Sequence, residues 1–113
     1  MQSAPEAMPT RCKPRSLGLL ISSTQFRGQL LELAESACAK GIALQIHLIA
    51  EAVMLARDPC FHELRACGRV TVCLESARAY GIAETLQNVK PPVLVPCRRF
   101  ADLLLACDRH LAF

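Results

Sequence analysis

Apolar residues along this chain gather in short runs separated by longer mixed stretches, a pattern that predicts alternating strands and helices. The runs at residues 16–21, 42–49 and 70–72 have the length and the Leu, Ile and Val content of buried strands. Prolines bracket a shorter expected strand at 93–95, and a last one is expected at 109–113. Because strands alternate with helices, we expect an α/β fold built on a mostly parallel sheet of five strands.

Helical spacing of apolar residues marks the segments between the strands. A helix from about residue 25 to 40 carries one apolar stripe of five residues, Phe26, Leu30, Ala34, Ala37 and Cys38. Asp58 and Pro59 start a second helix that ends at Gly68. The last helix opens at Cys97, and its stripe consists of Phe100, Leu103, Leu104 and Cys107. We therefore expect Cys38 and Cys107 in the core.

Length and composition indicate one domain. The chain has 113 residues and is 52% hydrophobic, enough for one packed core. Residues 1–15 contain Pro5, Pro9 and Pro14 and are expected to form a flexible arm, in which Cys12 is an incidental thiol. Residues 16–113 form the predicted domain.

Charge and cysteine content narrow the function classes. The net charge of +3 comes mostly from the first 15 residues, and aromatic residues are 4%, so nucleic-acid binding is not expected. No apolar run reaches the roughly 18 residues that a membrane span requires. Seven cysteines, an odd number without a secretory signal, favour a reducing cytoplasm in which free thiols persist.

Cys73 lies where a predicted strand passes into a predicted helix that ends at Gly81. Ligands of open α/β sheets bind at this carboxyl edge, and free N–H groups of a first helical turn favour a thiolate. A reactive thiol is one interpretation, and a small buried core residue is the other. Cys97 is at a similar junction beside Arg98 and Arg99, and local electrostatics do not rank the two. The two thiols could also cooperate.

Other polar residues receive simpler interpretations. His47, in an apolar strand, is expected to be a hydrogen-bonded core histidine rather than a base. Glu51 could line a pocket at the sheet edge, but a solvated carboxylate at a helix start is favoured. Cys60 and His62 are two residues apart on a helix and point away from each other, so a zinc site with Cys67 is not expected.

The segment Val-Thr-Val-Cys-Leu-Glu-Ser-Ala-Arg-Ala-Tyr-Gly-Ile at residues 70–82 resembles the cysteine motif of the DsrE/DsrF-like (TusD/DsrE sulfur-relay) family. The closing Cys-Asp-Arg-His-Leu-Ala-Phe at 107–113 is similar to the family's final strand, and the similarity covers residues 16–113. The resemblance implies a three-layer α/β/α sandwich and trimers or hexamers, homomeric or built with homologous subunits. The chain departs from the family pattern at residues 47–53, where the family often has an aromatic pair and an acidic-Gly-Val triplet.

Carried to this chain, the resemblance assigns the persulfide-bearing cysteine to Cys73 and favours it over Cys97, the possible second thiol. The first hypothesis is a sulfur-relay protein, a possible sulfurtransferase without a cofactor, that takes sulfur from a donor protein and passes it to an acceptor protein. The alternatives are a non-catalytic scaffold or binding subunit of such an oligomer, and a thiol redox sensor.

Overall fold

A computed structural model of the protein describes residues 15–113. In this range five strands form one sheet: β1 (Ser16–Ile21), β2 (Ala43–Leu48), β3 (Arg69–Cys73), β4 (Leu94–Val95) and β5 (Arg109–Ala112). Their order is β4-β3-β2-β1-β5, and every neighbouring pair is parallel. The predicted five-stranded sheet is confirmed. The predicted arm and Cys12 lie outside the described residues, except for the exposed Arg15.

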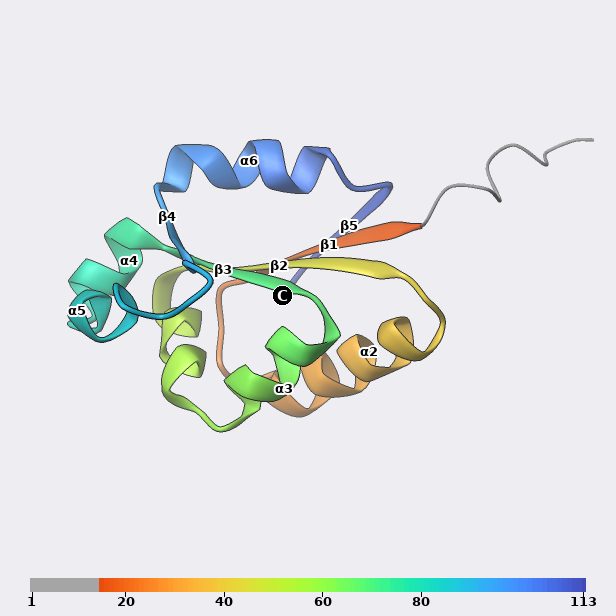
Figure 1. Ribbon diagram of the computed structural model, residues 1–113, viewed down its shortest axis with the longest axis horizontal. Helices are drawn as coiled ribbons and strands as arrows, with labels where there is room; N and C mark the ends of the chain where they lie inside the picture. Colours follow the sequence, from red (N-terminus) through yellow and green to blue (C-terminus); the bar gives the residue numbers. More distant parts are fainter. Residues whose placement is uncertain (1–14) are drawn as a thin grey trace, which may run out of the picture.

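Helices cover both faces of this sheet, as Figure 1 shows. On one face lie α2 (Arg27–Ala39) and α3 (Cys60–Cys67), and on the other lies α6 (Cys97–Leu105). The 3₁₀-helix η2 (Ala50–Arg57) follows β2, and the short helices α4 (Leu74–Ala79) and α5 (Ala83–Leu86) follow β3. The expected α/β/α sandwich is therefore present. None of the helices between residues 15 and 113 combines the length and apolar character needed to cross a bilayer.

The two faces of the sheet have different chemistry, because successive strand residues point to opposite sides. The main apolar core holds strand residues such as Leu19, Ile46 and Val72, together with Leu30 of α2 and Leu64 of α3. Three polar side chains are buried at the alternate positions, Gln45, His47 and Thr71. The α2 and α3 side of the sheet is thus the hydrophobic core, and the α6 side contains polar groups.

Helix α2 corrects part of the sequence prediction. Leu30, Ala34 and Ala37 are buried as expected, but Phe26 is 40% exposed and Cys38 is exposed. Cys38 follows Ala37 and is therefore turned about 100° around the helix, away from the narrow buried stripe. Phe26 precedes the helix and packs edge-on against Phe113, with ring centroids 6.2 Å apart. Cys38 is not a core residue.

In α6, the stripe expected from the sequence is only partly buried. Leu104 is buried, whereas Phe100, Leu103 and Cys107 are half-buried. Among residues 15–113, α6 is the one helix that faces the sheet on this side, so no neighbouring helix of the described range covers its flanks. Cys107 was expected in the core, but its side chain is only half-buried, so this prediction is wrong.

The first and last strands close the sheet at β1. Besides the β1–β5 ladder, Asp108 Oδ2 accepts the N–H of Ser16 at 3.0 Å, although the residues are 92 positions apart. In return, Ser16 Oγ accepts the N–H of Asp108 at 2.9 Å. This reciprocal pair fixes the start of β1 to the start of β5.

Candidate functional site

Cys73 is the last residue of β3 and the N-cap of α4, as the sequence predicted for this junction. Its backbone is extended, and the next residue is the first of α4. The N–H group of Ser76 donates a hydrogen bond to Cys73 Sγ over 3.4 Å. Backbone N–H groups in a first helical turn lack helical acceptors, so the sulfur acts as the cap of Ser76. A donor aimed at sulfur stabilises the thiolate.

A second contact brings a carboxylate beside the same sulfur. The Cys73 thiol donates a hydrogen bond to Glu75 Oε1 over 3.6 Å. Hydrogen bonds from the Glu75 backbone N–H and from the N–H of Cys97 lower the pKa of the Glu75 carboxyl below its ordinary value. The carboxylate is therefore charged at neutral pH.

Glu75 also connects the two cysteines that the sequence singled out. Its Oε1 atom accepts the N–H of Cys97, the first residue of α6, at 2.9 Å. In the parallel pairing of β3 with β4, Cys73 is opposite Val95, two residues before Cys97. One carboxylate oxygen thus contacts both the sulfur of Cys73 and the backbone of Cys97. The structure places both junctions at one corner of the sheet.

The two thiols differ in exposure. Cys73 is only 3% exposed, whereas Cys97 and Glu75 are exposed. The groups bonded to Cys73 Sγ are polar, and one of them is the exposed Glu75 side chain. Access to Cys73 therefore depends on displacement of Glu75 and the adjoining start of α6, and Cys97 is accessible without a rearrangement.

The first residues of η2, just after β2, support this corner. Ser76 Oγ accepts the N–H of Ala50 at 3.0 Å, and Ala50 has a positive φ of 51°. A left-handed backbone is costly for a residue with a Cβ atom, and this hydrogen bond helps to hold it. Glu51 accepts the N–H of Thr24 through Oε1 at 3.2 Å and is exposed, which agrees with the simpler interpretation of that carboxylate. Residues 47–53, where the chain departs from the DsrE/DsrF-like pattern, thus contact the cysteine site through the hydrogen bond from Ala50 to Ser76.

His47 lies under α6, on the same face of the sheet as Cys73. It is fully buried, its Nδ1 is 2.7 Å from Thr71 Oγ1, and its ring stacks on Phe100 with centroids 5.2 Å apart. Its Nε2 atom has no hydrogen-bond partner within residues 15–113. Burial lowers the pKa of His47 to about 4, so the ring is neutral at neutral pH. His47 is a hydrogen-bonded core histidine, as predicted.

The surroundings of three other cysteines favour the protonated thiol. Burial, followed by hydrogen bonding to Asp58, raises the pKa of Cys60 to about 11. Burial is also the main cause that raises the pKa of Cys67 and of Cys107. Cys60 is buried and His62 is exposed, so the two side chains point apart, as predicted. No group of three or more His, Cys, Asp or Glu side chains in the described range could hold a metal ion.

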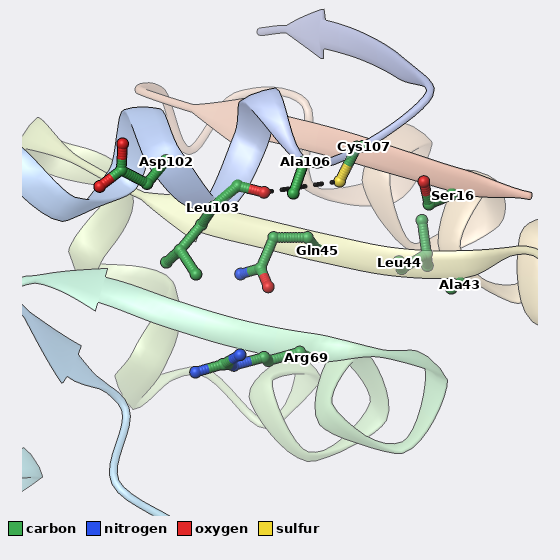
Figure 2. Close-up of a pocket in the computed structure, with 9 residues that line it drawn as sticks. All are labelled: Ser16, Ala43, Leu44, Gln45, Arg69, Asp102, Leu103, Ala106 and Cys107. Atoms are coloured by element: carbon green, nitrogen blue, oxygen red, sulfur yellow. Dashed lines mark hydrogen bonds between the residues drawn. The ribbon is translucent and has the colours of Figure 1, made fainter.

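A shallow pocket of about 370 Å³ opens at the opposite edge of the sheet (Figure 2). Its lining includes Ser16, Ala43 and Arg69, the first residues of β1, β2 and β3, so it lies at the amino ends of these strands. Gln45 and residues of α6 complete the wall. Neither Cys73 nor Cys97 lines this pocket, so it is separate from the thiol site.

Sequence reasoning found both cysteines but missed Glu75 and Ser76 as partners of Cys73. A local signal was available for Ser76, because the N–H three residues after an N-cap is directed at the cap. The bond from Cys97 N–H to Glu75 joins residues 22 positions apart, and only the fold brings these together.

Comparisons with protein-family models and with curated proteins identify no relative of this chain. A scan against protein-family models gives no match, and a search of curated proteins gives none either. Membership of the DsrE/DsrF-like family and the chemical roles of Cys73 and Cys97 stay predictions.

Proposed function

We propose that this protein is a sulfur carrier that holds a persulfide on Cys73 and passes the outer sulfur atom to an acceptor protein. The observation that carries the proposal is the N–H of Ser76 directed at Cys73 Sγ at the carboxyl edge of the sheet. This contact stabilises a sulfur anion without a metal or cofactor. The resemblance of residues 70–82 to the DsrE/DsrF-like motif supports the same assignment.

The proposed reaction is thiol–persulfide exchange. The Cys73 thiolate attacks the outer sulfur of a donor persulfide, a new S–S bond forms, and the donor's S–S bond breaks. The donor leaves as a thiolate and takes up the proton that Cys73 lost. In the second step an acceptor thiolate attacks the outer sulfur on Cys73, which returns to the thiol state. Each step exchanges one S–S bond for another, so no external oxidant or reductant is consumed.

Displacement of Glu75 is part of this proposal. The Cys73 sulfur is buried, and a charged carboxylate contacts it. A donor that displaces the exposed Glu75 side chain removes both the obstruction and the unfavourable charge. The outer sulfur of a persulfide extends beyond the thiol position and would lie beside Glu75 and the start of α6. Cys97, exposed there, is the nearest second thiol in the proposal.

Two alternatives each rest on one observation. The low exposure of Cys73 favours a non-catalytic scaffold or binding subunit, because such a subunit needs no accessible sulfur. The shared contact of Glu75 with Cys73 and Cys97 favours a redox sensor in which these thiols form a disulfide. As a carrier, the protein would work in a reducing cytoplasm with donor and acceptor proteins, within a trimer, hexamer or hetero-oligomer.

Mass spectrometry after incubation with a persulfide donor tests the proposal. Trypsin places each of the seven cysteines on a different peptide, and Cys73 is on residues 70–78. We expect a gain of about 32 Da, one sulfur atom, on that peptide and none after Cys73→Ser. Cys97→Ser is the matched control and should keep the gain on 70–78. If the added sulfur were found on other cysteine peptides but not on 70–78, the carrier proposal would fail and the scaffold function would remain. If a disulfide joined Cys73 to Cys97 and no persulfide formed, the result would support the redox sensor.

A further inference from the structure

The pocket at the amino ends of the strands has a floor of small side chains. In the register of the sheet, Ser16 pairs with Ala43. In the next row, Gln45 lies between Gly18 and Arg69. Paired residues of neighbouring strands share a face of the sheet, and here it is the face that α6 covers. Because Gly18, Ser16 and Ala43 fill little space, about 370 Å³ stays open between the sheet and α6 (Figure 2).

Helix α6 forms the other wall of this pocket, and its close approach to β1 holds it there. A Cβ atom at Gly18 would lie 2.9 Å from Leu104 Cδ2 and 3.3 Å from Cys107 Sγ. The helix therefore packs closely on β1 because that position has no side chain. Leu103 and Ala106, also on α6, give the pocket an apolar wall. This part of the pocket suits an aliphatic or aromatic group.

Three polar groups of the lining have no partner in the described part of the chain. Gln45 is 9% exposed, and its Nε2 atom donates to Thr71 Oγ1 over 3.4 Å, but no group of residues 15–113 donates to its Oε1 atom. Arg69 and Asp102 are exposed, and neither forms an ion pair in that range. Figure 2 shows the Gln45 amide between α6 and β3, with the Asp102 carboxylate and the Arg69 guanidinium on opposite sides of it. A cation, an anion and a buried acceptor thus surround one apolar space.

We propose that this pocket binds a free amino acid with an apolar side chain, such as leucine or phenylalanine. The α-carboxylate accepts hydrogen bonds from Arg69, and the α-ammonium donates to Asp102 and to Gln45 Oε1. The apolar side chain lies against Leu103 and Ala106, where it is removed from water. A simple carboxylate would be repelled by Asp102 and a simple amine by Arg69, so the two charges at the rim favour a zwitterion.

This site goes beyond the proposed sulfur carrier and does not depend on it. The pocket lies at the amino ends of β1, β2 and β3, whereas Cys73 and Cys97 lie at the carboxyl edge of the sheet. Cys107 is the cysteine of the lining, and its thiol donates to the carbonyl oxygen of Leu103 over 3.7 Å. Its reactivity can therefore report whether the pocket is occupied.

Protection of Cys107 from N-ethylmaleimide tests the proposal on the full chain. Trypsin releases Cys107 on residues 100–109, so its labelling is followed separately from that of the other cysteines. We expect L-leucine or L-phenylalanine at millimolar concentration to slow the labelling of this peptide and to leave that of Cys97, on residues 79–98, unchanged. Leucinol lacks the carboxylate and isocaproate lacks the ammonium, so each should protect at least about tenfold more weakly than L-leucine.

Substitutions at the rim make the result specific. Arg69→Gln and Asp102→Asn, both at exposed positions, should each weaken the binding of L-leucine, measured by isothermal titration calorimetry, by about tenfold or more. Arg98→Gln, exposed at the other end of α6, is the matched control and should leave the affinity unchanged. Cys73→Ser should also bind L-leucine as the wild type does, which separates this proposal from the sulfur-carrier function.

Three results would overturn the proposal. The first is that neither amino acid gives heat of binding or protects Cys107. The second is that leucinol and isocaproate protect as well as L-leucine, because the pocket would then be an apolar cleft that does not recognise the charges. The third is that labelling of Cys107 slows as the protein concentration rises and does not respond to amino acids, which would assign the pocket to a second copy of the chain.

Discussion

Glu75 is the side chain that connects the two cysteines at the carboxyl edge of the sheet. One oxygen of its carboxylate accepts hydrogen bonds from the Cys73 thiol and from the N–H of Cys97. The N–H of Ser76 donates a second hydrogen bond to the same sulfur. A polar donor and a charged acceptor thus both contact Cys73 Sγ, and the proposed chemistry is tested by changing the acceptor.

Glu75→Gln should make Cys73 more reactive. The substitution keeps the size of the side chain, removes the negative charge beside the sulfur, and weakens the hydrogen bond to Cys97. We expect alkylation of peptide 70–78 by iodoacetamide to proceed several-fold faster, because the negative charge beside the sulfur is removed. Glu84→Gln, on the exposed surface of α5, is the control and should leave the rate unchanged. An equal or slower rate for Glu75→Gln would show that the carboxylate does not restrain the thiol.

At the scale of the elements, the junctions between strands and helices carry the site. β3 passes directly into α4 at Cys73, and β4 reaches α6 through Pro96 at Cys97. The start of η2, just after β2, completes the group through the hydrogen bond from the N–H of Ala50 to Ser76 Oγ. Three successive connections at the carboxyl edge of the sheet thus meet around one sulfur atom.

Ala50→Gly should stabilise the protein. Ala50 has a φ of 51°, a left-handed conformation that costs a residue with a Cβ atom about 1 kcal/mol and costs glycine much less. Urea unfolding should therefore show a gain of about 1 kcal/mol. The same change at Ala101, exposed in the middle of α6, should lose about 1 kcal/mol. If Ala50→Gly lost stability as Ala101→Gly does, the strain assigned to this loop would be refuted.

Sequence patterns predicted the elements well because β1, β2 and β3 are short, mostly apolar runs with their own turn signals. Gly41 and Gly81 have φ values of 73° and 74°, and they end α2 and the turn after α4 as expected. Exposure within a helix was harder to predict. Cys38 and Ala37 are both small and apolar, and only the packing of α2 against its neighbours β2 and α3 decides which of them is buried.

At the scale of the whole molecule, the sheet has one aliphatic side and one side with buried polar groups. The second side places His47 and Thr71 beneath α6, where Phe100 stacks on the imidazole. The sequence predicted a buried His47, but it contained no local signal for the stacking. Phe100 follows His47 by more than fifty residues, and the approach of α6 to β2 depends on the strand order, which periodicity does not determine.

Protonation of His47 should destabilise the fold. Burial lowers its pKa from 6.5 to about 4, so the unfolded chain binds more protons between these values. The contribution to stability is complete above pH 6.5 and falls as the pH drops toward 4. Unfolding in urea at pH 7 and pH 5 should differ by about 2 kcal/mol from this group.

His47→Leu should remove that component and flatten the difference between the two pH values. His62→Gln, at an exposed position, is the matched control and should keep the wild-type difference. Equal pH dependence in His47→Leu and the wild type would mean that His47 is not the group responsible.

The pairing of β1 with β5, which begins at the bonds between Ser16 and Asp108, has a consequence for biosynthesis. The outer edge of β1 pairs with β5 only after residues 109–112 have left the ribosome, long after β2 and β3 are available. Until then the backbone amides and carbonyls of that edge are open to pairing with another nascent chain. Shortening the chain before residue 109 would make this exposure permanent, so such a product should aggregate even though its hydrophobic core is encoded in full.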